Sequence, residues 1–399
     1  MAKTSLKWLA LLSAVTIGAA SMARAQDSGA LLDVLVKKGM LSDQEAEDVR
    51  ADLGRDFAAT PWAVAGGKST TRLSVGGRMH LQYAHLNTDI ADTGADPVAT
   101  SNFLVRRMYL TFKAGLGPDW GAQLTYDFAS QSYDDAIVQW KPNSDLNIDM
   151  GLRKVNVAFE ERYTFGDIRA IERSPVTRYF VENKEAGAGN DRKLGAGSYR
   201  TGVHADGKFA SNLVWSAAIT NPQRQDSWTS ASTASTAATN NVAFFATFGT
   251  VGKFQNGIAY DIGVGGSLQP DQGGFNTATI GKGNDLELYS FHALLSNEKF
   301  MFMTEFLMAN VERGVNATTD ATPTGFFIQP SYYISDKLEA VLRYSYLDSD
   351  GRGVTLADGL RSAPSGGTMD KLTEYYVGAN YYLKGQDLKF QLGLVYGKT

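Results

Sequence analysis

The sequence contains no cysteine, and this absence excludes disulfide frameworks, thiolate metal sites and thiol nucleophiles. Beyond the first 25 residues it has no run of about 18 apolar residues, so no membrane-spanning helix is expected. Histidine is scarce, and His80, His85, His204 and His292 stand far apart without metal-ligand spacing. We therefore expect no metal, no cofactor and no catalytic residue.

An excess of basic residues is also missing, since 38 Lys and Arg stand against 42 Asp and Glu. Nothing in that balance indicates nucleic-acid binding. The C-terminal Gly397-Lys-Thr399 would complete a phosphate-binding loop only with a glycine at position 392, which is Leu392. What the sequence does have is 41 glycines, 18 tyrosines and 20 phenylalanines, a composition that favours β structure with many turns.

The N-terminus has the features of a secretory signal peptide. Lys3 and Lys7 precede an apolar stretch from Trp8 to Ala20, and Ala23-Arg24-Ala25 supplies a cleavage site. We predict that residues 1–25 are removed on export. Three basic residues and no acidic one leave with them, so the formal charge falls from −4 to −7.

Residues 28–57 predict two short helices. Gly39 ends the first, and Ser42-x-x-Glu45 reads as the capping box of the second. Short helices bury little surface alone, so this segment either joins subunits or is a solvated spacer. Residues 58–70 form a linker rich in small residues.

From Thr71 onward the pattern has a period of two. In residues 337–347, apolar side chains such as Leu342 alternate with polar ones such as Arg343, while Val341 and Leu347 break the pattern. Such runs predict strands with one apolar and one polar face. Tyrosine pairs and tryptophans fall near the ends of these runs, as in the aromatic girdles of membrane barrels.

We count fifteen candidate strands, mostly of 9–13 residues, in the range 71–399. Their length exceeds the 5–6 residues usual in soluble sandwiches and predicts an all-β fold, a transmembrane antiparallel β-barrel of about 16 strands. An even number is the rule, so we expect the sequence to stop before the closing strand. The candidate strands begin near Thr71, Phe103, Trp120, Asp135, Leu146, Gly197, Asn212, Val242, Gly257, Asp285, Phe300, Thr324, Lys337, Lys371 and Asp387.

Several motifs resemble the phosphate-selective porin family of the O and P type. The resemblance implies a homotrimeric outer-membrane porin, with a loop after about the fifth strand folded into the lumen, here residues 154–184. Residues 28–57 are also similar to the periplasmic helical extension that some members of this family have. The motifs, which cover roughly residues 71–220, are Phe103-Leu-Val-Arg-Arg-Met-Tyr-Leu110, Gly117-Pro-Asp-Trp120, Tyr126-Asp-Phe128, Met150-Gly-Leu-Arg-Lys154, Ala158-Phe-Glu160, Ile171-Glu-Arg-Ser174 and Tyr199-Arg-Thr-Gly-Val203.

This loop region carries a surplus of positive charge, with seven basic residues and five acidic ones in 153–184. Basic rings make an aqueous pore favour anions, and Arg suits phosphate and carboxylate because it donates two parallel hydrogen bonds. The loop acids could instead pair the arginines as scaffolding, and both readings remain open. The candidate pore-lining residues are Arg107, Arg153, Lys154, Arg162, Arg169, Arg173 and Arg178.

The expected function is passive diffusion of small hydrophilic solutes through the outer membrane of a Gram-negative-type bacterium, with a preference for anions such as phosphate. Its partners would be membrane lipids, small anionic or hydrophilic solutes and two further copies of the chain, and no nucleic acid. The chain departs from the family where Ala158-Phe159 replaces Pro-Phe, and it has no lysine-rich cluster for phosphate capture. A non-selective porin and an outer-membrane barrel enzyme are the alternatives.

Overall fold

A computed structural model describes residues 64–65, 71–87, 100–182, 192–209, 212–222, 241–275, 284–363 and 367–399. The predicted signal peptide (1–25), the helical segment (28–57) and all of the linker except Val64 and Ala65 lie outside these residues and stay predictions. The chain divides into two compact units. One lies within Met1–Gly76 and Thr111–Pro118, and the other comprises Gly77–Leu110 and Asp119–Thr399.

The strands form one sheet of seventeen, of which two are short: β1 (Val64–Ala65), which pairs with the start of β2, and β13 (Thr319–Ala321), which pairs with β12. The other fifteen have 8 to 17 residues, and each begins within three residues of a predicted start. They are β2 (Thr71–Leu86), β3 (Thr100–Leu116), β4 (Trp120–Asp127), β5 (Ser132–Asn143), β6 (Leu146–Lys154), β7 (Tyr199–Lys208), β8 (Leu213–Thr220), β9 (Ala243–Lys253), β10 (Ala259–Gln269), β11 (Leu286–Ser296), β12 (Phe300–Asn316), β14 (Thr324–Ser335), β15 (Leu338–Asp348), β16 (Lys371–Lys384) and β17 (Leu388–Lys398).

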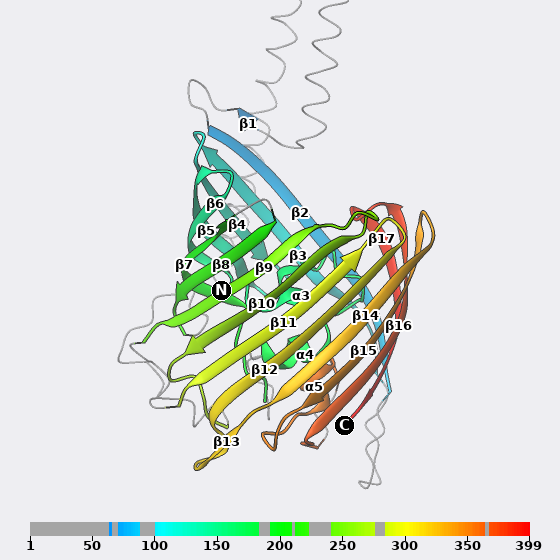
Figure 1. Cartoon of the computed structure of the whole chain (residues 1–399). Coiled ribbons are helices and arrows are strands. Elements are labelled where there is room, and N and C mark those ends of the chain that lie inside the picture. The colour runs from blue at the N-terminus through cyan, green and yellow to red at the C-terminus, as the bar shows by residue number, and fades with distance from the viewer. Residues whose placement is uncertain are drawn as a thin grey trace, which may run out of the picture. The chain divides into compact units, whose positions relative to one another are not determined.

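The order of the strands is that of a meander. From β4 to β12, and from β14 to β17, each strand pairs antiparallel with the next, and β12 pairs with β14. Tight turns connect some of them, such as β9 and β10. Gly257 follows Asn256 in the turn between β9 and β10 with a φ of 81°, a conformation that glycine adopts without steric cost. Figure 1 shows β10 to β16 side by side in this order.

The two faces of the sheet have opposite chemistry. In β15 the side chain of Leu342 is 51% exposed, whereas Glu339 and Arg343 on the other face are 0% and 4% exposed. The same exposed apolar face continues over neighbouring strands through residues such as Phe306, Ile328, Val377 and Leu392. A soluble sheet hides its apolar face in a core, whereas a barrel wall in lipid presents that face outward. We call the face that carries Glu339 and Arg343 the inner face.

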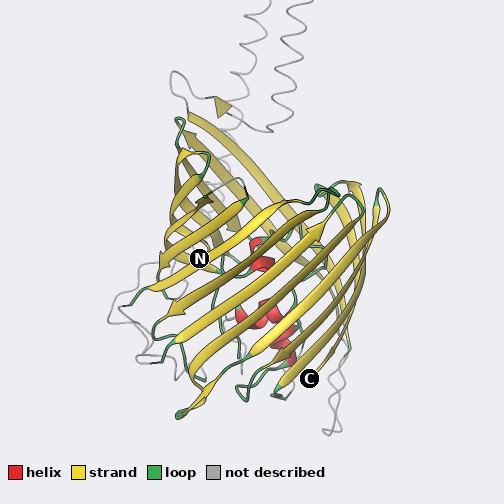
Figure 2. Ribbon diagram, viewed as in Figure 1, coloured by secondary structure: helices red, strands yellow, loops and turns green. Residues whose placement is uncertain are grey.

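In the part of the chain that the structure describes, the short helices lie on the inner face (Figure 2). They are α3 (Phe159–Arg162), α4 (Pro175–Phe180) and α5 (Leu356–Gly359). Helix α4 begins with Pro175 after Ser174, whose hydroxyl accepts a hydrogen bond from Thr177 N at 3.1 Å. Helix α5 has a capping box between Thr355 and Asp358. No helix in the described part of the chain is long and apolar enough to cross a membrane.

Val341 and Leu347, the two exceptions to the alternation, mark where residues 155–182 pack on the wall. Leu347 is fully buried in a cluster that also contains Val176 and Phe180 of α4, and Val341 is buried with Ala170 and Tyr376. Burying one such side chain contributes about 1.5–3 kcal/mol. Apolar residues on the inner face are therefore the contact surface for residues 155–182.

Candidate functional site

The segment 155–182, which we call the inner loop, leaves the wall where β6 ends at Lys154. Its helix α4 contacts β12, β14 and β15. Apart from Lys154, which belongs to β6, it covers the described part of the region predicted to enter the lumen, 154–184.

A wall carboxylate anchors the start of the inner loop. Glu305 of β12 is fully buried and accepts hydrogen bonds from Phe159 N at 2.5 Å and Glu160 N at 3.0 Å. Glu160 in turn accepts from Ser174 N at 3.0 Å and from Thr177 Oγ1 at 2.5 Å, and so connects α3 to α4. These bonds satisfy amide groups that short helices leave without partners.

Arg343 of β15 fixes the middle of the inner loop to the wall. Its Nε and Nη2 donate to the two carboxylate oxygens of Glu374 at 2.8 and 3.1 Å. Its Nη1 donates to the carbonyl oxygen of Glu172 at 2.9 Å and lies 3.5 Å from Glu160 Oε1. A buried ion pair of this kind is strongly destabilised when one partner is removed.

Glu182, at the end of the inner loop, gathers three guanidinium groups. Arg361, Arg178 and Arg173 lie 2.8, 3.0 and 3.3 Å from its oxygens. Burial alone would raise the pKa of this carboxyl, but the three arginines outweigh burial and hold the pKa well below its usual range.

Glu172 is the second point where arginines converge. Arg106, Arg107 and Arg361 lie 2.6, 2.8 and 3.3 Å from its oxygens. Burial would raise the pKa of Glu172, yet these neighbours lower it to about 2. Phe165 supports the same cluster, since the guanidinium of Arg107 lies 3.5 Å from its ring centroid.

The seven predicted pore-lining residues differ in how far their side chains are exposed to solvent. Arg107, Arg173 and Arg178 are 3%, 3% and 1% exposed and pair with Glu172 or Glu182. Arg162 and Arg169 are more accessible, with side chains 29% and 19% exposed.

The accessible residues also have partners. Arg162 lies 3.2 Å from Asp261, and Arg169 lies 3.4 Å from Glu339. Arg153 pairs with Asp149 and, at 3.0 Å, with Asp206. The half-buried Lys154 donates to the carbonyl oxygen of Glu161 at 3.2 Å.

Sequence reasoning missed five of the charged residues that position the loop. Three of them, Glu305, Arg343 and Glu374, are charged residues at inner positions of otherwise apolar or aromatic strands, and Glu305 interrupts the run FMFMTEFLM. That isolation was a usable signal. No comparable sequence signal marks Arg106 and Arg361, because their shared partner Glu172 lies far away in the sequence.

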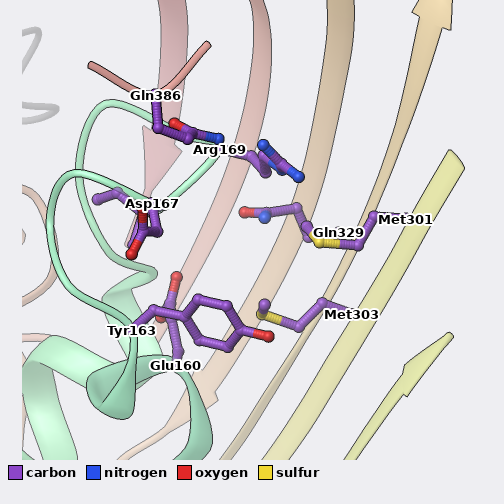
Figure 3. Close-up of a pocket in the computed structure, with 9 residues that line it drawn as sticks. Glu160, Tyr163, Asp167, Arg169, Met301, Met303, Gln329 and Gln386 are labelled. Carbon is purple, nitrogen blue, oxygen red and sulfur yellow. The ribbon is translucent and has the colours of Figure 1, made fainter. Parts of the chain in front are cut away.

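A cavity of about 180 Å³ lies beside the inner loop. Figure 3 shows side chains from the loop, from β12 and β14 and from the turn before β17 converging on it. Arg169 and Gln329 lie at one end, with Met301 and Met303 along one wall. The full lining is Glu160, Tyr163, Asp167, Ile168, Arg169, Met301, Met303, Gln329 and Gln386. Within the described ranges, no group of three His, Asp or Glu side chains could hold a metal ion.

Comparison with known proteins identifies the fold and family. The family model described as "Phosphate-selective porin O and P" matches residues 73–399. Among solved structures, Salmonella typhi OmpF is 14% identical with a TM-score of 0.51, over 84% of this chain and 100% of that one. The outer-membrane channel DcaP of Acinetobacter baumannii is 14% identical with a TM-score of 0.50, over 84% and 93%. Pseudomonas putida OprB is 10% identical with a TM-score of 0.51, over 81% and 89%. No curated protein sequence matches. The predicted all-β, antiparallel barrel fold is confirmed.

Proposed function

Because the chain belongs to the phosphate-selective porin O and P family, we propose that its outer-membrane channel passes small hydrophilic solutes by passive diffusion and favours anions. The porin channel follows from the family and the fold, whereas the anion preference and the absence of enzymatic activity are proposals. The side chains on the two faces of the sheet support a channel, since the exposed face is apolar and the opposite face is charged.

The inner loop is the proposed constriction. It lies against β12, β14 and β15, so it would narrow the channel from that side. Irregular backbone at membrane depth must be buried in protein or line water, and the anchors on Glu305 and Arg343 provide the protein contacts. A loop held in this way can filter solutes by size.

The partial exposure of Arg169 supports the anion preference most directly. Its side chain is 19% exposed and lines the cavity, whereas Arg173 and Arg178 are buried against Glu182. We therefore assign selectivity to Arg169, with Arg162 and Lys154 contributing, and a scaffolding role to Arg107, Arg173 and Arg178. A charge beside water in a narrow pore changes ion permeability.

A non-selective porin is the second candidate, and charge pairing favours it. Arg162, Arg169 and Arg153 each lie within 3.4 Å of a carboxylate, which reduces the net field in the lumen. The signal peptide, the periplasmic helical segment and the homotrimer remain proposals that rest on the sequence and on the family resemblance.

Planar-bilayer recording tests the proposal. The purified protein should form channels with ohmic conductance, and the reversal potential in a KCl gradient should show that chloride is more permeable than potassium. A reversal potential of zero would support the non-selective alternative. Absence of any conductance from correctly folded protein would contradict the channel itself.

A further inference from the structure

The cavity beside the inner loop has polar donors without acceptors. Arg169 Nη1 donates to the Tyr382 hydroxyl at 2.9 Å, but in the described structure its Nη2 has no hydrogen-bond partner. Gln329 is only 2% exposed, and the one hydrogen bond of its side chain among the described residues brings its Oε1 to 3.5 Å from Arg343 Nη1. Because Arg343 can only donate, the amide oxygen of Gln329 must face it, which leaves the NH₂ group unpartnered at the cavity.

The acceptors around the cavity are already engaged. Glu160 is 3% exposed and takes hydrogen bonds from Ser174 and Thr177. Asp167 is exposed at the rim and accepts from the Thr164 hydroxyl at 3.0 Å. Arg169 and Gln329 line this cavity, and their free donors are open to it, so a ligand with acceptor oxygens can take the place of water at both donors.

The remaining walls of the cavity are apolar. Met301, Met303 and Ile168 are 8%, 4% and 6% exposed and line the same space. The ring of Tyr163 lies between the methionines and the inner loop (Figure 3). Methionine packs against aromatic rings with favourable sulfur contacts.

We propose that this cavity is a binding subsite for a small organic carboxylate with an apolar body. The carboxylate accepts from Arg169 Nη2 and the Gln329 amide, and the apolar body packs on Met301 and Met303. The proposal rests on the proposed channel function and narrows its substrate class.

Inorganic phosphate fits this cavity less well than a carboxylate. Its oxygens point in all directions, so some of them would face methionine side chains and lose hydrogen bonds made in water. A carboxylate carries its acceptors at one end only. The volume of about 180 Å³ is below the 300–1,000 Å³ of pockets for drug-sized ligands, so the ligand is of benzoate size or smaller.

Equilibrium binding of labelled benzoate to the detergent-solubilised protein tests the subsite. We expect saturable binding, with acetate and inorganic phosphate competing at least tenfold more weakly. Arg169→Gln should weaken benzoate binding at least tenfold, whereas Lys337→Gln, which removes an exposed charge from the turn between β14 and β15, should leave it unchanged. Met303→Gln should weaken benzoate binding and leave acetate binding unaffected.

Gln329→Met provides an independent variant in case Arg169→Gln fails to fold, and it should also weaken binding. Phosphate competing as well as benzoate, or wild-type benzoate affinity in a folded Arg169→Gln or Gln329→Met protein, would overturn the proposal. Binding is measured without conduction, so the two proposals can fail separately. A conducting channel that does not bind benzoate refutes only the subsite, and a non-conducting protein that binds it refutes only the channel.

Discussion

Two sides of the inner face differ in what covers them. On β12, β14 and β15 the inner positions include Leu307, Phe327 and Leu347, which are fully buried beneath the inner loop. On β4 to β7 most inner positions are polar, and many of them are buried where they bond to one another or to the backbone, as Gln123 does to Asp135 at 3.0 Å. We call these the docked side and the open side. The same alternating pattern therefore serves two roles, and the apolar inner residues decide where the loop lies.

The largest expected effect of a single substitution is on the docked side. Glu182→Gln leaves three arginines facing a neutral amide, and breaking a buried ion pair costs roughly 3–5 kcal/mol. Hydrogen exchange should show lost protection of the amides of α4 while the wall strands stay protected. Asp206→Asn on the open side is the matched control, because Arg153 retains Asp149 and the side chain of Asp206 is 36% exposed. Equal loss of protection in both variants would remove the distinction between the sides.

A second substitution tests the apolar contact surface. Leu347→Ala should lower the free energy of unfolding by about 2–5 kcal/mol, because it opens a cavity beneath the inner loop. Leu342→Ala, on the exposed face of the same strand, should cost clearly less. Urea unfolding in lipid vesicles measures both variants. The reverse ranking would mean that the inner and outer faces are exchanged.

Acid should loosen the docked side within a defined pH range. Glu172 has a pKa of about 2, lowered from 4.5, so its ion pairs stabilise the loop fully above about pH 4.5. That stabilisation is lost as the pH falls toward 2, and Glu182 titrates in the same direction. Protection of the inner loop should therefore hold from pH 7 to 5 and fall below 4.5, less so in Glu172→Gln. Loss already between pH 7 and 5 would contradict this assignment.

The smallest effect should come from the accessible pair of Arg162 and Asp261. Their side chains are 29% and 18% exposed, and pairs of this kind contribute less than about 1 kcal/mol. Arg162→Gln should leave the urea midpoint nearly unchanged. A shift as large as that of Glu182→Gln would show that Arg162 belongs to the scaffold.

The sequence predicted the wall well because strand periodicity is local. All fifteen long strands were found, and Val341 and Leu347 stood out as exceptions, although their meaning needed the structure. Among the strands of the described residues, the short β1 and β13 were missed.

Charge pairing was not predictable in the same way. Glu172 lies 66 residues from Arg106 in the sequence, and Arg169 lies 213 residues from Tyr382. Which arginine is buried and which faces the cavity depends on how the loop docks across several strands. The sequence therefore indicated a group of arginines but could not show which of them are buried and which line the cavity.

A designed disulfide tests most directly whether the inner loop is docked on β14. A Cβ placed on Gly325 would lie 3.1 Å from Val176 Cγ1, close to the Cβ–Sγ separation across a disulfide bond. The chain has no other cysteine, so Val176→Cys with Gly325→Cys can form only this bond within one subunit. Val176→Cys with Phe326→Cys is the control, because Phe326 points to the opposite face of the strand, and Gly325→Cys alone checks folding. We predict that the first pair oxidises, the control pair stays reduced, and the linked protein keeps its single-channel conductance. Free thiols in the first pair, or a channel closed by the bond, would contradict a loop docked on this side of an open pore.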